Sequence, residues 1–342
     1  MTPTLPASWY TDPAIAARER TAIFARNWAL FGPAHEVAEP GSRSARTVNG
    51  WPMIVLRGSD GTLRAFHNVC RHRAARLLEE GTGTCGARIV CPYHGWSYGQ
   101  DGRLLIAPRF GENLDADEAA LLPVRVETWR GCLFVCVDPA APDFESWLGP
   151  LPELCASYPQ TESFDYHGSF TVEGRANWKT YCDNTVEGYH LPFVHERLSR
   201  AVDGASVEIR DYHEHRLVCF HVGYRGDGAG LRGADGLWFY RYPGFQAVLG
   251  ATGFKAERIE PVGAGALRSE SWAWYGGGLG HNERADAFAW AETIAKEDLG
   301  ICETVQTNLE AGAYETGWLS PAMESHTAAF QALVREDLAS AT

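Results

Sequence analysis

The chain has 342 residues, of which 45% are hydrophobic and 21% charged, with a formal net charge of −13 at pH 7. This length allows one large or two ordinary globular domains, and the acidic balance argues against nucleic acid or an anionic membrane as a partner. The N-terminus lacks the pattern of a signal peptide, and no run of about 18 apolar residues could span a membrane. We therefore expect a cytoplasmic protein without a membrane segment, whose nine cysteines stay reduced and favour metal over disulfides.

The first elements change from helix to strands. Asp12-Pro13 is a helix start signal, and an apolar stripe follows it, which predicts a helix over 13–29. Short apolar runs separated by turn residues, between about 40 and 137, predict a small all-β module. The Pro- and Ala-rich stretch 138–147 is expected to be a domain boundary.

Helices and strands are mixed in the remainder of the chain. Helices are expected over 177–191, 282–310 and 320–339, and strands over 216–224, 236–242, 245–250 and 269–275. The pattern predicts an α+β protein in which a small all-β domain, 41–140, is inserted in or precedes a larger domain of antiparallel sheet and helices, 1–40 and 141–342. The segment 228–233 matches GxGxxG, but a strand pattern follows it, so we expect a hairpin loop rather than a dinucleotide site.

Two short pairs of metal-binding residue types lie in the all-β module. They are Cys70-x-His72 and Cys91-x-x-His94. Such a set suits either tetrahedral zinc or a Rieske [2Fe–2S] cluster, in which two histidines bind one of the two irons. Zinc fingers usually pair Cys with Cys and His with His, whereas each pair here combines one of each, which favours the cluster. A zinc-stabilised binding protein and an electron-transfer Rieske protein without oxygenase activity are the alternatives.

A second set of candidate ligands lies in the predicted helices of the larger domain. Asn184, Glu187 and His190 follow one another at intervals of three, and His195 comes shortly after them. Asp298 falls in the middle of an apolar stripe, where an unpaired carboxylate is costly to bury. Two histidines and one carboxylate form the facial triad of non-haem Fe(II) oxygenases.

Each part of this second set also has a simpler interpretation. Lys179, Asp183 and Glu187 are spaced by four and suit a ladder of ion pairs on a solvated helix face. Asp298 could instead be neutralised by a buried Lys or Arg.

The segment around the Cys/His pairs, including CPYHGW, resembles the Rieske motif of the α subunits of ring-hydroxylating oxygenases, and the resemblance extends over most of the chain. One departure is HRAAR, where the family often has HRGA. The resemblance implies a [2Fe–2S] cluster on Cys70, His72, Cys91 and His94, and an Fe(II) ion on His190, His195 and Asp298. It also implies that Glu187, the main catalytic candidate together with Asn184, links the iron to the cluster of a neighbouring subunit in a homotrimer.

The function implied by this resemblance is that of a terminal oxygenase. A reductase of the flavin or ferredoxin type would supply electrons, and O2 would hydroxylate or oxidatively demethylate a small organic substrate. The form N-x-x-E-x-Y-H resembles the branch of choline, carnitine and glycine-betaine oxygenases and of short aromatic-acid monooxygenases, so both amine oxidation and aromatic catabolism are open. Alternating aromatic residues on two predicted strands could line the pocket, and they suit a planar ring or, through cation–π contact, a quaternary ammonium. They are Trp238, Tyr240, Trp272 and Trp274.

Overall fold

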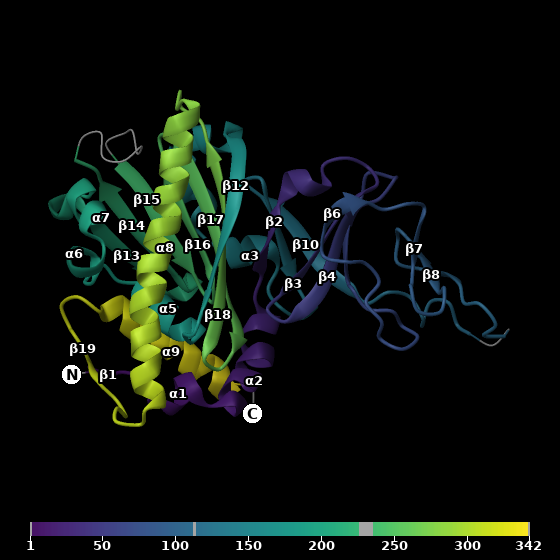
Figure 1. Cartoon of the computed structure of the whole chain (residues 1–342), viewed down its shortest axis with the longest axis horizontal. Helices are drawn as coiled ribbons and strands as arrows, with labels where there is room; N and C mark the ends of the chain where they lie inside the picture. The colour runs from purple at the N-terminus through teal and green to yellow at the C-terminus, as the bar shows by residue number, and fades with distance from the viewer. Residues whose placement is uncertain (1, 112–113, 226–234, 341–342) are drawn as a thin grey trace. The chain divides into compact units, whose positions relative to one another are not determined.

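The computed structural model describes residues 2–111, 114–225 and 235–340, and it divides into two compact units (Figure 1). One, the β unit, is Ala25–Pro142, and the other, the mixed unit, combines Met1–Phe24 with Asp143–Thr342. The β unit begins earlier than the predicted residue 41, because residues 29–33 form a strand of its sheet instead of the end of a helix. The glycine-rich segment 228–233 lies outside the described residues.

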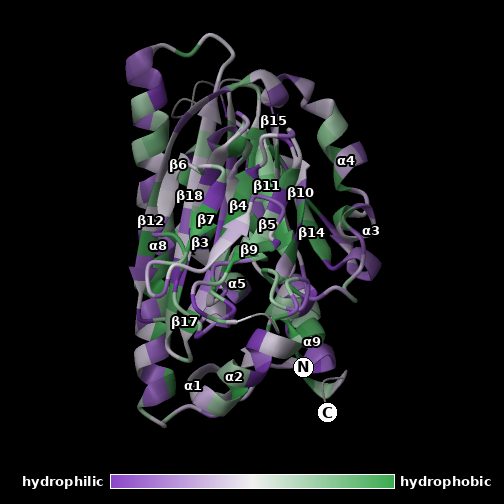
Figure 2. Ribbon diagram, turned by 90° about the vertical axis from the view of Figure 1, so that its right-hand side faces the viewer, coloured by the Kyte–Doolittle hydropathy of each residue, from purple (hydrophilic) through white to green (hydrophobic). Residues whose placement is uncertain are grey.

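The β unit holds a seven-stranded antiparallel sheet in the order β2-β11-β10-β5-β4-β3-β6 and a three-stranded sheet in the order β7-β8-β9. All five residues of β11 are buried, and this strand is among the hydrophobic segments of Figure 2. The strands are β2 (Ala29–Pro33), β3 (Ser42–Val48), β4 (Trp51–Arg57), β5 (Leu63–His67), β6 (Gly81–Thr84), β7 (Arg88–Val90), β8 (Ser97–Gly99), β9 (Leu104–Ile106), β10 (Pro123–Trp129) and β11 (Cys132–Cys136).

The mixed unit is built on a seven-stranded antiparallel sheet in the order β12-β18-β17-β16-β15-β14-β13. Its strands are β12 (Asp165–Gly174), β13 (Glu208–Tyr212), β14 (Leu217–Gly223), β15 (Asp235–Arg241), β16 (Phe245–Gly250), β17 (Gly253–Gly263) and β18 (Ala266–Tyr275). A short pair, β1 (Thr2–Pro3) and β19 (Trp318–Leu319), joins the two ends of the unit. Its helices are α1 (Ser8–Thr11), α2 (Pro13–Ala22), α3 (Phe144–Leu148), α4 (Leu151–Leu154), α5 (Trp178–Thr185), α6 (Leu191–Val194), α7 (Glu196–Ala201), α8 (His281–Glu310) and α9 (Ser325–Ser340).

Helix α8 runs across one face of this sheet, as Figure 1 shows, and we call that face the helix-covered face. Phe288 of α8 packs edge-on against Phe170 of β12, and Trp290 packs in a cluster with Phe220 of β14. Two apolar residues of α8, Ile301 and Val305, lie away from its buried side and are 41% and 40% exposed. None of the described helices is both long and apolar enough to cross a membrane.

Two predicted helices are shorter than expected. The one predicted over 13–29 ends at Ala22, and a short 3-10 helix, Phe24–Arg26, follows before β2 begins at Ala29 and pairs with β11. The one predicted over 177–191 ends at Thr185, and residues 186–190 form a turn. The carboxylate of Glu187 accepts the backbone N–H groups of Tyr189 and His190 in this turn, so it satisfies donors that an α-helix would direct to its own carbonyls.

The interpretation of Lys179, Asp183 and Glu187 as a solvated ladder is wrong. The Lys179 side chain is 0% exposed, and its ammonium pairs with the carboxylate of Glu19 in α2 at 2.5 Å. Asp183 accepts a hydrogen bond from the hydroxyl of Tyr10 in α1 at 2.7 Å. Helix α5 is therefore an interior helix, held to the N-terminal helices by buried polar contacts, and this rigid attachment positions the residues that follow it.

Candidate functional site

The loop of the β unit that carries Cys70 and His72 is closed by its own backbone. The Cys70 N–H donates to the carbonyl of Ala75 at 2.8 Å, and the Ala74 N–H donates to the carbonyl of Cys70 at 3.0 Å. Ala74 has a φ of 57°, in the left-handed region that disfavours residues with a Cβ. The loop thus holds two side chains of ligand type, Cys70 and His72, on one tight turn.

The loop that carries Cys91 and His94 repeats this hydrogen-bond pattern at the same offsets. The Cys91 N–H donates to the carbonyl of Trp96 at 2.7 Å, and the Gly95 N–H donates to the carbonyl of Cys91 at 3.1 Å. Gly95 has a φ of 73° and takes the place of Ala74 in the first loop. The two loops are therefore structural equivalents, and each presents one thiol and one imidazole.

The two loops bring their candidate ligands together. Cys70 and Cys91 are each 2% exposed and belong to the same buried cluster of the β unit. The rings of His72 and His94 lie with centroids 4.8 Å apart. Burial raises the pKa of the Cys70 thiol, so iron binding must displace its proton. Two adjacent buried thiols beside two adjacent imidazoles match the donor set of a Rieske cluster, with one iron on sulfur and one on nitrogen.

Two supporting residues here were not identified from the sequence. The hydroxyl of Tyr98 lies 3.2 Å from Cys70 Sγ and accepts the backbone N–H of Arg71 at 3.1 Å. The Trp96 ring stacks on His72, with centroids 4.9 Å apart and an angle of 6° between the planes. Both residues follow closely after His94 in the sequence, and this position was the signal that could have identified them as supporting residues.

In the mixed unit, three side chains from different elements converge. His190 caps the N-terminus of α6, His195 follows the C-terminus of the same short helix, and Asp298 lies inside α8. One potential ligand atom from each lies within 4.8 Å of the other two. Asp298 Oδ1 is 2.9 Å from His195 Nε2 and 3.5 Å from His190 Nε2. The structure thus assembles the three residues predicted as the iron triad.

Each of these histidines is oriented by a second carboxylate. His190 Nδ1 lies 2.5 Å from Glu187 Oε1, and His195 Nδ1 lies 2.7 Å from Glu297 Oε2. Both contacts turn the Nε2 atoms toward Asp298. Histidines that bind metals usually donate their other ring N–H to such a partner. Glu187 was expected from the sequence to act at the iron site, whereas Glu297 was not identified as a supporting residue; its position next to Asp298 was the signal.

The charge at this site fits a divalent cation. Burial disfavours protonation of His195, but Asp298 and Glu297 outweigh burial and raise its pKa. Carboxylates that favour an imidazolium also favour a metal ion in its place. Asn184 Nδ2 donates to Asp298 Oδ1 at 2.6 Å, and among the described residues no Lys or Arg forms an ion pair with Asp298. The simpler interpretation of Asp298, a pair with a buried cation, is therefore wrong.

The four aromatic residues predicted to line a pocket do not share one wall. Ala273 of β18 packs under α8, so its neighbours Trp272 and Trp274 point to the opposite face of the sheet. Tyr240 lies on the helix-covered face, but it is buried, and its hydroxyl donates to the carbonyl of Pro243 at 2.5 Å. Trp238 lies on the same face and keeps partial exposure. The four residues therefore do not line one pocket together, because Trp272 and Trp274 face away from the helix-covered side.

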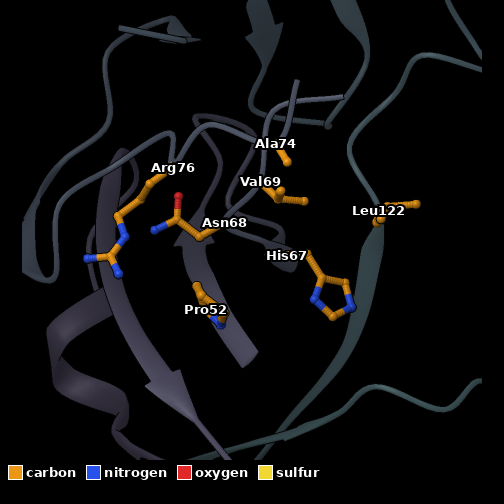
Figure 3. Close-up of a pocket in the computed structure, with 7 residues that line it drawn as sticks. All are labelled: Pro52, His67, Asn68, Val69, Ala74, Arg76 and Leu122. Atoms are coloured by element: carbon orange, nitrogen blue, oxygen red, sulfur yellow. The ribbon is translucent and has the colours of Figure 1, made fainter. Parts of the chain in front are cut away.

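A hollow of about 360 Å³ lies on the β unit behind the first Cys/His loop (Figure 3). Its lining residues are Pro52, His67, Asn68, Val69, Ala74, Arg76 and Leu122. The side chain of Asn68 is occupied in holding this loop, since its Oδ1 accepts the N–H groups of Leu77 and Leu78 at 3.0 Å each. The hollow contains none of the candidate ligands, so we do not assign the reaction to it.

Comparison with known families matches both units. The family described as Rieske [2Fe-2S] domain matches residues 27–127, and the family described as ring hydroxylating alpha subunit (catalytic domain) matches residues 161–229 and 256–340. Choline monooxygenase, chloroplastic, of Beta vulgaris is 29% identical over 337 residues, which cover 92% of this chain and 72% of that protein. The carnitine monooxygenase oxygenase subunit of Escherichia coli K12 is 36% identical over 202 residues, which cover 58% of this chain and 54% of that protein.

Solved structures agree with these matches. The quaternary ammonium Rieske monooxygenase CntA in complex with L-carnitine superposes with a TM-score of 0.85 at 25% identity, over 98% of this chain and 96% of that chain. Naphthalene 1,2-dioxygenase from Rhodococcus sp. shares the fold, with a TM-score of 0.82 at 19% identity over 98% and 94% of the chains. This chain belongs to the family of Rieske-type ring-hydroxylating oxygenase α subunits.

Membership defines the general biochemistry of the chain. It is a terminal oxygenase that carries a [2Fe–2S] cluster and a mononuclear iron. It is the oxygenase subunit of a multicomponent system and receives its electrons from a reductase partner. When bound, the cluster supplies one-electron transfer and the iron supplies activation of O2.

Proposed function

We propose that this chain is a monooxygenase for a small quaternary ammonium compound. One oxygen atom of O2 enters a C–H bond of the substrate, and the other leaves as water, with two electrons from the reductase and two protons. Hydroxylation of an N-methyl group would release formaldehyde, so hydroxylation and demethylation are outcomes of one reaction type. The convergence of His190, His195 and Asp298 is the observation that carries the proposal, because a triad of this kind leaves coordination positions open. The choice of substrate rests on the choline and carnitine monooxygenases among the relatives.

The ligand assignments follow the geometry of the two sites. We assign the cluster to Cys70, His72, Cys91 and His94, and the mononuclear iron to His190, His195 and Asp298. Glu187 and Glu297 orient the two iron histidines, and Asn184 fixes the Asp298 carboxylate. Glu187 is also our candidate for the link to the cluster of a neighbouring subunit.

We further propose that the chain assembles as a homotrimer in which the β unit of one copy docks on the mixed unit of the next. The charges of the two units support such pairing. Residues 25–142 contain 13 Arg and 12 acidic residues, for a net charge of +1, whereas the remaining residues contain 17 basic and 31 acidic residues, for a net charge of −14. Contacts between unlike surfaces close into rings. Light scattering should therefore show a trimer or stacked trimers, and a catalytically competent monomer would contradict this assembly.

The reductase is expected to be of the flavin or ferredoxin type, since the GxGxxG match of this chain at 228–233 is followed by a strand pattern and not by the helix that a dinucleotide site requires. We place the reaction in the cytoplasm, where free thiols persist. All nine cysteines are buried, and Cys70 and Cys91 among them are our cluster ligands.

The experiment that tests this function couples the purified chain to a reductase with NADH and measures O2 uptake. Choline, glycine betaine, L-carnitine and benzoate serve as candidate substrates, and mass spectrometry identifies the products. We expect O2 uptake with a quaternary ammonium compound, matched by hydroxylated product or formaldehyde. Productive turnover of benzoate alone would favour the aromatic-acid alternative. Reduction of the cluster without O2 uptake for any substrate would favour an electron carrier.

A further inference from the structure

The helix-covered face of the mixed unit's sheet is partly open in its centre. Trp238, Gln246, Val248 and Lys255 lie on three adjacent strands and point to this face, and all four keep partial exposure. The residues that alternate with them along the same strands, on the opposite face, are buried. Central strands under a packed helix are normally sealed on that side, so the exposure of these four residues leaves this part of the face accessible to a ligand.

A charged pair stands in this partly open region. Lys255 Nζ lies 2.6 Å from Glu257 Oε2, and the two side chains are 19% and 0% exposed. The Ser269 hydroxyl donates to Glu257 Oε1 at 2.5 Å, so both oxygens of the carboxylate are engaged. An ammonium group has three N–H donors, and Glu257 is the one partner that the described residues provide for it. Two donors of Lys255 thus remain for a ligand.

The pair lies near the candidate iron site. Tyr181 of α5 is buried, and burial, Glu257 and Asp298, in that order of effect, raise the pKa of its phenol. Glu257 belongs to the sheet and Asp298 to α8, so the Tyr181 phenol lies within electrostatic range of carboxylates from both elements. Helix α5 also contacts β17, the strand that carries Lys255 and Glu257. Helix α5 therefore contacts both the strand that carries the charged pair and α8, which carries Asp298.

We propose that Lys255 binds a carboxylate of the substrate and thereby selects acids over the corresponding alcohols. This inference rests on the proposed oxygenase function and specifies its substrate class as a small zwitterion of the betaine type. A carboxylate accepts hydrogen bonds from the two donors of Lys255 that Glu257 leaves. A quaternary ammonium group has no N–H or O–H and carries the same charge as Lys255, so it must lie elsewhere.

Trp238 offers a place for the ammonium end. Its strand neighbour is Val248, whose own neighbour on the next strand is Lys255, so Trp238 and Lys255 are two strand spacings apart, or about 10 Å. The indole N–H of Trp238 donates to the hydroxyl of Tyr224 at 2.8 Å, which fixes the ring, and a partly exposed indole is a candidate for cation–π contact. This separation suits a zwitterion with only a few bonds between its two charges.

The test is equilibrium binding by calorimetry to the iron-loaded chain, without reductase and without O2. Glycine betaine and choline form a matched probe pair, because both carry a trimethylammonium on a two-carbon chain and differ in carboxylate against alcohol. Benzoate and benzyl alcohol form a second pair without the ammonium group. We expect the acid of the first pair to bind about 10- to 100-fold more tightly than the alcohol, the range for a hydrogen bond to a charged group. Equal affinities, or no binding of either acid at millimolar concentration, would overturn the proposal.

Variants separate the charge of Lys255 from its structural role. Lys255→Met should abolish the preference for the acid, whereas Lys255→Arg should keep it. Because Lys255→Met leaves Glu257 buried without a cation, the double variant Lys255→Met/Glu257→Gln removes both charges and should also lose the preference. Lys296→Met, at a side chain 62% exposed on α8, is the matched control and should bind like the unmodified chain. A preference that survives both Lys255→Met and the double variant would overturn the assignment.

The same preparations distinguish this inference from the proposed function. Iron content, the cluster spectrum and O2 uptake are measured beside the affinities. Tight binding of glycine betaine that depends on Lys255, without O2 uptake, would support the inference and contradict the function. Turnover of choline at the same efficiency as glycine betaine would support the function and contradict the inference.

Discussion

The two metal-binding regions of this chain are built in opposite ways. The candidate cluster ligands lie between Cys70 and His94, on two loops that are each closed by their own backbone hydrogen bonds. The candidate iron ligands lie between His190 and Asp298, and they meet only because α6 and α8 are packed in the same unit. Local sequence is therefore sufficient for the first site, whereas the second depends on tertiary packing. Damage to one should leave the other intact.

The residues that support the ligands also differ between the two regions. In the cluster loops, Trp96 stacks on His72, and the Tyr98 hydroxyl contacts a thiol. At the iron site, the supporting groups of the two histidines are the carboxylates of Glu187 and Glu297. Hydroxyl and ring contacts adjust the electronic state of a cluster, whereas carboxylates raise the basicity of imidazole ligands and favour a dication.

The largest expected effects come from removing one ligand at each region. Asp298→Ala should abolish turnover and remove most mononuclear iron, because two imidazoles alone hold Fe(II) weakly, while the visible spectrum of the cluster stays unchanged. Cys91→Ser should bleach that spectrum and leave the mononuclear iron in place. Iron analysis measures the metal content of both variants, and electron paramagnetic resonance detects their clusters. Loss of both centres in either variant would contradict the independence of the two regions.

The carboxylates behind the histidines should give intermediate effects of unequal size. Glu187 is 9% exposed and Glu297 is 41% exposed, so water can replace the second more easily. Glu187→Gln should slow oxidation of the reduced cluster in a single turnover by about 10- to 100-fold, and Glu297→Gln by about tenfold or less. Stopped-flow absorbance with substrate and O2 measures both rates. A Glu187→Gln variant with the rate and product yield of the unmodified chain would show that this carboxylate does not act on the iron site.

A smaller effect is expected at the cluster thiol. Tyr98→Phe removes the hydroxyl 3.2 Å from Cys70 Sγ and should lower the reduction potential of the cluster, because a donor to sulfur stabilises the more negative reduced state. Redox titration followed by the visible spectrum measures the shift. The iron content of the variant should stay at the value of the unmodified chain. An unchanged potential would mean that the Tyr98 hydroxyl does not donate to the thiol in solution.

The smallest effect concerns the two equivalent turn positions in the cluster loops. Ala74→Gly should raise the free energy of unfolding of the β unit by up to about 1 kcal/mol, since glycine adopts its left-handed φ of 57° without steric cost. Gly95→Ala should lower it by about 1–2 kcal/mol, because a Cβ there meets only Pro108 at an ordinary 3.5 Å and the cost is in the backbone. The temperature at which the cluster absorbance is lost compares the two variants. A destabilised Ala74→Gly variant would contradict the equivalence of the loops.

The sequence was most informative where ligands and their support are close along the chain. The Cys/His spacing predicted both cluster loops, and the acidic residue in the long helix was correctly expected to meet the two histidines. The helix predicted over 177–191 was too long, since its periodicity continues through residues that instead form the turn held by Glu187. Glu187 and His190 still meet, but through this turn and not through a shared helix face.

Contacts between elements that are distant along the chain could not be predicted from the sequence. The burial of Lys179 depends on Glu19 in a helix 160 residues away, so a spacing of four suggested a solvated face that does not exist. The alternation of Trp272 and Trp274 was evident, but the face to which they point depends on where α8 packs. Periodicity indicates that residues share a face, and only the fold decides what that face contacts.

The central claim is that one chain holds a Rieske cluster and a separate mononuclear iron. Metal analysis together with electron paramagnetic resonance of the dithionite-reduced protein tests it most directly. The account predicts about three irons per fully loaded chain, two in the cluster and one mononuclear, with negligible zinc and the signal of a reduced Rieske centre. A colourless protein that contains about one zinc per chain and gives no such signal would contradict it.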